Sequence, residues 1–456
     1  MIQQWDVIVI GAGPGGLAAA TSARKNGAKK VLIIERESVV GGVLNQCIHD
    51  GFGLIRYKKQ LSGPEYAALA KLEAIESGVE IRTGLMVVNI TQTHEIQAIG
   101  PNGIEFFSAK AIVLATGCRE RTRGAIMTPG SRPAGVFTAG VAQNLINIRN
   151  IMVGKKIVIV GSGDIGLIMA RRLYLEGAKV LCVVELLTEP CGLARNISQC
   201  LYDYNIPLYL GYIVTNIIGK RRVEGVEISA VDKDKQIIPN TNKKIECDTV
   251  IFSVGLIPEN EIALSAGVML NGSNGIKTDE YLQSNISGVF SCGNCRSVMD
   301  LADFVSEQGT VAGKNAAFFI QQKKLEQWQN KTNIIFKKGL PEKNSFTCSF
   351  CPRGCQINIK DGDINGNKCK RGKLFVEQEM KDPKRILTTT VKVLSGSTPL
   401  VGVRSNRPIS LSNVMNIINI LKTKQVTAPI HFGEVLFANC AGVDFIAENE
   451  VSVKNE

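Results

Sequence analysis

The sequence predicts an α/β protein in which two nested βαβ units, each built around a parallel sheet, precede a small C-terminal α+β domain that is rich in cysteine. Two observations lead to this prediction. A pattern of strand, glycine-rich turn and helix that starts at residue 6 returns after 150 residues. Four cysteines lie within 22 residues near residue 350. The length of 456 residues also agrees with this prediction, because a chain of that length usually forms about three domains.

The composition is that of a globular protein, with 45% hydrophobic residues, 21% charged residues and 45 glycines. It excludes disordered and collagen-like chains. The sequence has no run of 18 apolar residues, and a strand pattern follows residues 1–5 directly. We therefore expect no transmembrane segment, no signal peptide and a cytoplasmic location. The net charge is +12, of which residues 331–456 carry +8, but the lysines are scattered and aromatic residues make up only 6%, so we do not expect nucleic-acid binding.

The first unit begins with a strand over 6–10 (DVIVI) that runs into a glycine-rich turn and an alanine-rich helix. In such a turn Gly11 permits the tight bend, Gly13 lets the backbone approach a pyrophosphate, and Gly16 allows close packing of helix on strand. The helix N-terminus attracts the phosphates. Glu35, which ends the next strand, is placed to accept hydrogen bonds from a ribose diol.

The second unit repeats these features, and its corresponding residues are Gly161, Gly163, Gly166 and Glu185. Two complete copies, each with a terminal glutamate, predict two Rossmann-like nucleotide-binding domains. Glu185 favours NAD over NADP because a carboxylate would repel a 2′-phosphate. Arg171 and Arg172 lie nearby in the sequence, so we expect the coenzyme to be NAD(P)H, with NAD favoured.

Local patterns predict the remaining elements. A serine cap with proline and glutamate after it, at 62–65, introduces a helix over 66–77. The expected strands lie over 6–10, 30–34, 111–114, 156–160, 386–394 and 430–437, and the other expected helices over 17–25, 306–319 and 411–422.

Three further motifs, at 115–117 (ATG), 254–258 (VGLIP) and 288–294 (GVFSCGN), give the chain a family resemblance. Over residues 5–325 it resembles the flavoproteins with two dinucleotide-binding domains, the thioredoxin reductase and glutathione reductase superfamily. The resemblance implies an NAD(P)H-linked, FAD-dependent oxidoreductase. The last motif of that superfamily usually ends in Gly-Asp, whereas this chain has Gly293-Asn294.

The resemblance assigns residues and domains. The implied FAD-binding residues are Gly11, Gly13, Gly16, Glu35, Gly42, Thr116, Gly117, Gly293, Asn294, Gln308 and Gly309, and the implied NAD-binding residues are Gly161, Gly163, Gly166, Glu185 and Gly255. The implied domains are an FAD domain (1–120 and 256–325), an NAD(P)H domain (121–255), a linker (326–345) and a C-terminal four-cysteine domain (346–456). The helix over 306–319 is expected to hold Glu307, Gln308 and Gly309 in its first turn and to point its N-terminus at the flavin.

Narrower stretches refine the resemblance: NQCIHDGFGL at 45–54, ATGCRERTRGA at 115–125, GSGDIGLIMARR at 161–172 and VSEQGTVAG at 305–313. They look like the flavoproteins associated with anaerobic glycerol-3-phosphate dehydrogenase and, more distantly, the flavin subunits of opine oxidase and hydrogen cyanide synthase. The resemblance implies a redox partner, either an FAD-type dehydrogenase or a small electron carrier. A homo-oligomer is also compatible with it.

The cysteines near the flavin are unusual for this superfamily. Its disulfide reductases carry a cysteine pair in the segment after Gly41-Gly42, where this chain has only Cys47. A dithiol relay needs two adjacent sulfurs, so Cys47 and His49 are candidate catalytic residues as a thiolate, a charge-transfer partner or a proton donor, with simple packing as the alternative. Cys292 and Cys295 have dithiol spacing but overlap the FAD motif, so two buried thiols are favoured over a redox pair.

The C-terminal cysteines suggest a metal centre. Cys348, Cys351, Cys355 and Cys369 could complete the ligand shell of a [4Fe–4S] cluster or of a tetrahedral zinc ion. Iron is favoured because the C-x2-C-x3-C spacing resembles the cluster segment of molybdopterin oxidoreductases. A flavin accepts a hydride as two electrons, and a cluster beside it would release these electrons one at a time. The whole C-terminal domain resembles an uncharacterised domain that occurs beside such flavoproteins.

These features predict a flavoenzyme that exchanges a hydride with NAD(H) and relays electrons through an iron–sulfur centre to a partner, with glycerol-3-phosphate dehydrogenase as one choice. Three alternatives stay open. The first is an NADH oxidase or quinone reductase with a structural zinc tail. The second is a dithiol reductase that uses Cys292 and Cys295. The third is an assembly subunit whose nucleotide sites do not turn over.

Overall fold

The computed structural model describes residues 2–329, 336–342, 344–360 and 362–454. The chain divides into two compact units. Unit 1 comprises Met1–Arg119 and Leu256–Thr332, and unit 2 comprises Glu120–Gly255 and Asn333–Glu456. Every helix among the described residues is too short or too polar to traverse a lipid bilayer.

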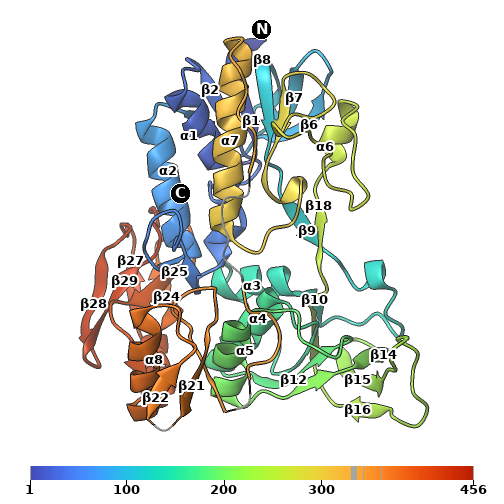
Figure 1. Ribbon diagram of the computed structural model, residues 1–456, viewed down its shortest axis with the longest axis vertical. Coiled ribbons are helices and arrows are strands. Elements are labelled where there is room, and N and C mark those ends of the chain that lie inside the picture. Colours follow the sequence, from blue (N-terminus) through green and yellow to red (C-terminus); the bar gives the residue numbers. More distant parts are fainter. Residues whose placement is uncertain (1, 330–335, 343, 361, 455–456) are drawn as a thin grey trace. The chain divides into compact units, whose positions relative to one another are not determined.

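Unit 1 is built on a mixed seven-stranded sheet (Figure 1). In spatial order its strands are β5 (Glu80–Arg82), β2 (Val31–Ile34), β1 (Gln3–Ile10), β8 (Gly103–Leu114), β7 (Glu95–Gly100) and β6 (Met86–Ile90), and β19 (Val289–Ser291) also pairs with β8. The pairs around β1 are parallel, while β7 and β6 add an antiparallel edge. The shorter elements are η1 (Gly42–Gln46), β3 (Asp50–Phe52), β4 (Leu61–Ser62), β9 (Cys118–Glu120), β18 (Leu256–Pro258), α6 (Glu261–Ser265) and η4 (Gly293–Cys295).

Both faces of β1 are buried over residues 7–10, which explains the uninterrupted run of apolar residues there. Val7 and Val9 belong to the core that contacts the helices α1 (Pro14–Lys25), α2 (Gly63–Glu76) and α7 (Ala302–Ile320). Ile8 and Ile10 belong to the core on the opposite face, which includes side chains of β6, β7 and α6. The strand therefore fixes the glycine turn that follows it in a rigid frame.

Helices α1 and α7 lie against each other at very short range (Figure 1). A Cβ atom at Gly309 would lie 2.1 Å from the carbonyl oxygen of Gly15, and one at Gly313 would lie 1.9 Å from that of Ala19. Neither helix could approach so closely with a larger residue at these points. Gly309, which the family resemblance assigned to FAD, thus has a packing role here.

Ser62 caps helix α2, as the sequence predicted, and the capping box is complete, although the helix begins at Gly63 rather than at residue 66. The backbone N–H of Ser62 donates to Oε2 of Glu65 (2.7 Å), and the backbone N–H of Glu65 donates to Oγ of Ser62 (3.4 Å). These two bonds satisfy amide groups that the first turn of a helix leaves free.

The first part of unit 2 holds a five-stranded parallel sheet and a three-stranded antiparallel sheet. The parallel strands are, in order, β10 (Val136–Thr138), β17 (Thr249–Phe252), β11 (Lys156–Val160), β12 (Lys179–Glu185) and β13 (Leu208–Leu210), and the antiparallel strands are β14 (Tyr212–Gly219), β15 (Val223–Ala230) and β16 (Lys243–Ile245). The helices are η2 (Gly124–Ile126), α3 (Ala139–Asn147), α4 (Asp164–Leu175), α5 (Ala194–Cys200) and the short η3 (Tyr202–Tyr204). The strand predicted over 156–160 is β11, with the same bounds.

The second part of unit 2 is richer in strands than in helices. Its elements are β20 (Phe346–Thr347), β21 (Gln356–Lys360), β22 (Asp363–Asn365), α8 (Lys370–Lys381), β23 (Lys384–Arg385), β24 (Thr388–Leu394), β25 (Leu400–Ser405), β26 (Ile409–Ser410), η5 (Leu411–Asn413), α9 (Val414–Lys422), β27 (Gln425–Thr427), β28 (Val435–Cys440) and β29 (Val443–Ala447). A five-stranded sheet in the order β27-β24-β25-β29-β28 shares its core with α9 and with Leu175 at the end of α4. The predicted fold class, α/β with a small C-terminal α+β domain, is confirmed.

Several predicted elements have wrong boundaries, and one prediction cannot be followed throughout. The helices expected over 17–25, 66–77 and 411–422 are Pro14–Lys25, Gly63–Glu76 and Val414–Lys422. The helix expected over 306–319 begins at Ala302, so Glu307, Gln308 and Gly309 lie in its second turn. The strand expected over 430–437 begins only at Val435, because Ile430 makes an isolated bridge with Val451 instead. The linker predicted over 326–345 lies partly outside the described residues, at 330–335 and 343.

Candidate functional site

Two glycines of the first turn are required by packing. Gly11 has φ +101°, and a Cβ there would lie 2.4 Å from the carbonyl oxygen of Ala115. A Cβ at Gly16 would lie 1.9 Å from the carbonyl oxygen of Gly11. These contacts are to backbone atoms, which cannot move aside. The turn is therefore closed on the side that faces the sheet.

Gly13 is different, because open space lies beside it. A Cβ at Gly13 would meet no atom within 4 Å, and its φ of −70° is one that any residue can adopt. Gly13 is also the N-cap of α1, and glycine has no side chain that could cap the amide groups of that helix end. Uncapped amides and open space together fit the pyrophosphate of a dinucleotide. Gly42, which the family resemblance also assigns to FAD, borders this space, since its Cβ would lie 3.3 Å from Cα of Gly13.

Glu35 is held in place by the turn itself. Its side chain is 6% exposed, Oε2 accepts a hydrogen bond from the N–H of Ala12 (2.7 Å), and Oε1 accepts one from the N–H of Glu37 (2.9 Å). A carboxylate has about four acceptor sites. The two bonds fix its orientation and leave acceptor capacity for a ribose diol.

The end of β8 and the start of α7 supply the other residues that the resemblance assigns to FAD. Oγ1 of Thr116 donates to the carbonyl of Glu259 (2.6 Å), and Gly117, with φ +78°, has open space beside it. Gln308 is fully buried; its Oε1 accepts from the N–H of Gly293 (2.7 Å), and its Nε2 has no hydrogen-bond partner among the described residues. A buried amide donor without a partner is costly, and a polar group of a bound flavin nucleotide would satisfy it.

Asn294 is largely committed within the protein. Its Oδ1 accepts from the N–H of Met299 (3.0 Å), and its Nδ2 donates to the sulfur of Cys118 (3.4 Å). It therefore holds the turn after β19 in shape, whatever it contributes to a ligand.

The start of α7 depends on a residue that the sequence did not single out. Asp303 lies in the first turn and accepts a hydrogen bond from the N–H of Arg56 (2.8 Å). Burial raises the pKa of Asp303, while the N–H groups of Arg56, Gly53 and Ile55 oppose that rise. Because these partners lie about 250 residues earlier in the chain, local sequence patterns could not reveal them.

The second glycine turn repeats the geometry of the first. A Cβ at Gly161 would lie 2.1 Å from the carbonyl oxygen of Ser253, and one at Gly166 would lie 2.8 Å from that of Gly161. Gly163, in contrast, has the side chain of Ser253 as its nearest neighbour, at 3.6 Å, and is the N-cap of α4 without a side-chain cap. Gly255 has φ +104°, with Arg121 as its nearest neighbour at 3.7 Å. This turn also leaves space beside its central glycine.

Glu185 is fixed as firmly as Glu35, with an additional partner. Its Oε2 accepts from both the N–H (2.9 Å) and the hydroxyl (2.6 Å) of Ser162, and its Oε1 accepts from the N–H of Leu187 (2.9 Å). Sequence reasoning missed Ser162. The available signal was the serine in GSG at a position where the first turn has the alanine of GAG.

The candidate catalytic residues lie on the segment between η1 and β3. Cys47 is buried and ends η1, and its carbonyl accepts from the N–H of Gly63 (2.8 Å) at the start of α2. The ring of His49 lies 5.1 Å from that of Phe52, tilted by 47°. No cysteine of the chain, all of which lie within the described ranges, takes part in a disulfide.

Cys292 and Cys295 are both fully buried. The thiol of Cys295 donates to the carbonyls of Cys292 (3.2 Å) and Leu114 (3.4 Å). Burial raises the pKa of Cys292 well above its ordinary value, and the charge of Cys295 adds to the rise. Buried thiols of this kind are poor nucleophiles, which favours packing over dithiol exchange.

The four C-terminal cysteines belong to one small module at residues 346–381. Cys348 lies in a core with Ile357 and Phe375, and Cys369, the exposed N-cap of α8, has its pKa lowered chiefly by the N–H of Gly372. Burial is the main cause that raises the pKa of Cys348 to about 11. A backbone hydrogen bond from Phe350 opposes this rise, and the charges of the other three cysteines of the module add to it. The other three cysteines are therefore near enough to Cys348 for their charges to act on it. Nevertheless, in the described part of the chain no three His, Cys, Asp or Glu side chains converge in a geometry that could hold a metal ion.

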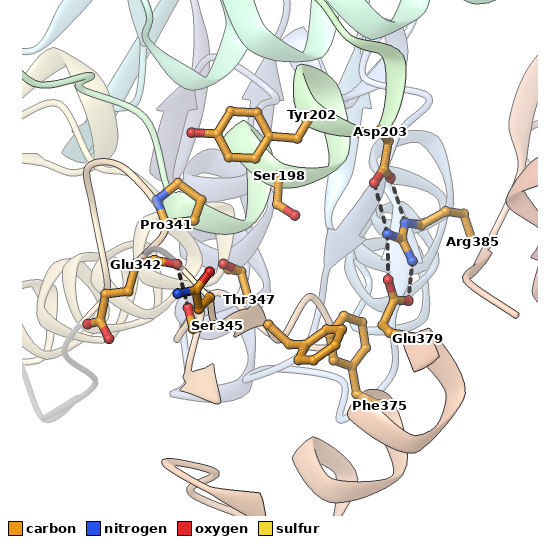
Figure 2. Close-up of a pocket in the computed structure, with 12 residues that line it drawn as sticks. Ser198, Tyr202, Asp203, Pro341, Glu342, Ser345, Thr347, Phe375, Glu379 and Arg385 are labelled. Carbon is orange, nitrogen blue, oxygen red and sulfur yellow. Dashed lines mark hydrogen bonds and ion pairs between the residues drawn. The ribbon is translucent and has the colours of Figure 1, made fainter. Parts of the chain in front are cut away.

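A cavity of about 340 Å³ lies in unit 2 beside this module (Figure 2). Its lining includes Tyr202 and Asp203 of η3, Thr347, and Phe375 of α8. None of the residues that the sequence assigns to FAD, NAD or a metal lines it. We therefore do not regard it as the catalytic pocket.

Beside the cavity, a buried ion-pair network ties the module to η3. The guanidinium of Arg385 lies between two carboxylates (Figure 2), with Nε 2.8 Å from Asp203 and Nη1 2.5 Å from Glu379. The side chains of all three are about one-tenth exposed. The C-terminal module is thus anchored to the parallel-sheet part of unit 2.

We expect Arg385→Met to lower the free energy of unfolding by about 3–5 kcal/mol, because two buried carboxylates would be left without a cation. Urea unfolding followed by circular dichroism measures the change. Lys384→Met is the matched control, since the ion pair that Lys384 makes with Asp382, 3.7 Å away, is exposed. Adding Glu379→Gln to Arg385→Met should restore part of the loss. An Arg385→Met protein as stable as the Lys384→Met protein would contradict the anchoring role.

Comparison with known proteins agrees with this geometry. The family model described as pyridine nucleotide-disulphide oxidoreductase matches residues 5–330, and a model described as a protein of unknown function (DUF1667) matches residues 370–448, after the four cysteines. The chain is 27% identical over 353 residues to a dihydrolipoyl dehydrogenase of Chlamydia trachomatis, covering 70% of this chain and 71% of that protein. It is 27% identical over 341 residues to an NADH oxidase of Methanocaldococcus jannaschii, covering 68% and 69%.

A solved structure shows the same fold. The thioredoxin reductase of T. acidophilum superposes with a TM-score of 0.57 at 24% identity, covering 70% of this chain and 98% of that one. The predicted resemblance to this superfamily is confirmed. The chain belongs to the pyridine nucleotide-disulphide oxidoreductase family and is an NAD(P)H-linked, FAD-dependent oxidoreductase.

Proposed function

We propose that this enzyme exchanges a hydride between NAD(H) and FAD and relays electrons through a [4Fe–4S] cluster, held by the four C-terminal cysteines, to a partner protein. The observation that carries the flavin and nicotinamide parts is the paired geometry of the two turns. Beside its central glycine the first turn has open space, and the second turn has only van der Waals neighbours at 3.6 Å or more. In both turns this glycine is the N-cap of a helix and lies next to a buried glutamate. Residues 1–120 and 256–325 are the proposed FAD domain, and residues 121–255 the proposed NAD(P)H domain.

The residues of the FAD site divide the work of binding. Gly13 admits the pyrophosphate, Glu35 accepts from the ribose diol, and Nε2 of Gln308 donates to the nucleotide. The others, which shape the site or border it, are Gly11, Gly16, Gly42, Thr116, Gly117, Gly293, Asn294 and Gly309. Bound FAD supplies a ring that takes a hydride from nicotinamide and releases two electrons, together or singly.

The NAD site and the candidate catalytic residues complete the proposal. Gly163 admits the second pyrophosphate between Gly161 and Gly166, Gly255 borders the site, and Glu185 accepts from the ribose diol and favours NAD over NADP. Positioning of the two rings does most of the catalysis. Cys47 and His49 then hold or move a proton beside the flavin rather than act as half of a dithiol relay.

The cluster is proposed from donor chemistry and proximity. Four thiolates suit an iron–sulfur cluster or zinc, and the charges of three cysteines act on Cys348. Since these side chains do not converge as a ligand shell in the described part of the chain, the metal would draw them together on binding. A cytoplasmic enzyme and either an FAD-type glycerol-3-phosphate dehydrogenase or a small electron carrier as partner complete the proposed function.

One experiment tests the whole proposal: an anaerobic visible spectrum before and after NADH, with iron and zinc analysis of the same sample. We expect flavin bands that bleach with NADH and about four irons per chain. A colourless protein that ignores NADH would overturn the flavoenzyme. One zinc and no iron would overturn the cluster and leave the flavoenzyme intact.

Removing a ligand separates the two centres. Cys351→Ser is expected to lose the iron and the transfer of single electrons, while NADH still bleaches the flavin at the wild-type rate. Cys440→Ser, which changes a half-buried cysteine of β28 outside the module, is the matched control. Equal iron contents in the Cys351→Ser and Cys440→Ser proteins would contradict the assignment of the ligands.

A second candidate function is that of an NADH oxidase. It is favoured by the single cysteine, Cys47, in the segment where disulfide reductases carry a pair, and by the similarity to the NADH oxidase of Methanocaldococcus jannaschii. In that case oxygen would accept the electrons directly, and the tail would hold a structural zinc. Oxygen uptake unaffected by Cys351→Ser but lowered by Cys47→Ser would support the oxidase.

A further inference from the structure

The exposed edge of the four-cysteine module is strongly basic. Residues 366–373 contain four basic residues and no acidic one, and all four are exposed: Lys368, Lys370, Arg371 and Lys373. They flank Cys369, the exposed member of the proposed ligand set. Positive charge is therefore concentrated at the point where the proposed cluster would come nearest to solvent.

This edge also has an apolar centre. Leu374 on α8 is 61% exposed. It lies four residues after Lys370 and three after Arg371, so it shares their face of the helix. An exposed apolar side chain with a charged rim is typical of a protein docking surface.

The charge and size of the surface favour one kind of partner. A negatively charged protein would be steered towards it. The surface comprises one loop and the first turns of one helix, which suits the small, short-lived contacts of electron-transfer complexes. Nucleic acid fits less well, because binding of single strands uses exposed aromatic rings. In this module Phe350 and Phe375 instead contact each other in the core, with ring centroids 5.6 Å apart.

We propose that residues 366–374 form a docking surface for a small acidic protein that carries one electron. The proposal rests on the proposed function and identifies the partner of its iron–sulfur centre. One NADH and two oxidised carriers would give one NAD⁺, one proton and two reduced carriers, so atoms and electrons balance.

The test uses the full-length holoenzyme, NADH and two probe proteins. Rubredoxin is a small acidic one-electron carrier, and cytochrome c is a small basic one. In Lys368→Glu/Lys373→Glu we expect the second-order rate of rubredoxin reduction to fall at least about tenfold at low salt. The loss should shrink at high salt, and cytochrome c reduction should not fall. Lys233→Glu/Lys277→Glu makes the same charge change at two exposed lysines elsewhere and should leave both rates unchanged.

The outcomes separate this proposal from the proposed function. Iron content and flavin bleaching by NADH, measured on every variant, report the proposed function alone. If both are normal and rubredoxin is reduced equally well by the two double variants, the docking surface is wrong. A labelled RNA that loses affinity only for Lys368→Glu/Lys373→Glu, with rubredoxin reduction unchanged, would assign the surface to nucleic acid and overturn the proposal.

Discussion

A Gly13→Val enzyme is expected to fold normally and to be purified without flavin. The backbone at Gly13, with φ −70° and ψ −177°, accepts valine, and its Cβ would meet no protein atom within 4 Å. The added side chain would instead occupy the space proposed for the pyrophosphate of FAD. We expect bound flavin to fall below about a tenth of the wild-type level, a loss of at least about 1.4 kcal/mol of binding free energy. Absorbance of the released flavin measures the content.

Two controls make this result specific. Gly272→Val places the same side chain at another glycine with nothing within 4 Å, but not at a helix N-terminus, and should keep its flavin. Gly16→Ala should destabilise the protein with or without flavin, by about 1–3 kcal/mol, because its Cβ would strike the carbonyl of Gly11. Thermal unfolding should therefore separate Gly16→Ala from Gly13→Val, when each is compared with wild-type protein stripped of flavin. A Gly13→Val protein with full flavin content would remove the first turn from the FAD site.

The glycine turns could be predicted from the sequence because their requirements are local. Gly11 and Gly16 meet within six residues, and the 150-residue repeat shows the same need twice. The start of α7 could not be predicted in this way. It depends on Asp303, which is bound by the N–H of Arg56 from a distant part of the chain. Contacts between remote segments leave no mark in a local pattern.

The candidate sites show the same difference between local features, which the sequence reveals, and contacts between distant segments, which it does not. Glu35 and Glu185 were placed by their distance from the turns, and both are buried against them. The four cysteines were recognised from their spacing, but spacing does not select iron or zinc, and the ligand shell would close only around the metal. The anchoring of the C-terminal module through Asp203, Arg385 and Glu379 joins three separate elements, so it became visible only in the structure.

A Gly163→Val enzyme is expected to be yellow but unable to use NADH. The backbone at Gly163, with φ −64° and ψ 159°, accepts valine, and its nearest neighbour is the Ser253 hydroxyl at 3.6 Å. The side chain would fill the space proposed for the coenzyme pyrophosphate, while the first turn stays unchanged. Flavin content should therefore equal that of wild type.

The redox behaviour should show which half of the enzyme has failed. Dithionite should bleach the flavin of Gly163→Val completely, whereas the rate of anaerobic bleaching by NADH, followed by stopped flow at sub-saturating coenzyme, should fall at least about a hundredfold, equivalent to about 2.7 kcal/mol. Gly272→Val should match wild type with both reductants. Because Gly13→Val is expected to lose the colour and Gly163→Val only the response to NADH, the pair assigns each turn to one nucleotide. Bleaching of Gly163→Val by NADH at the wild-type rate would show that the coenzyme binds elsewhere.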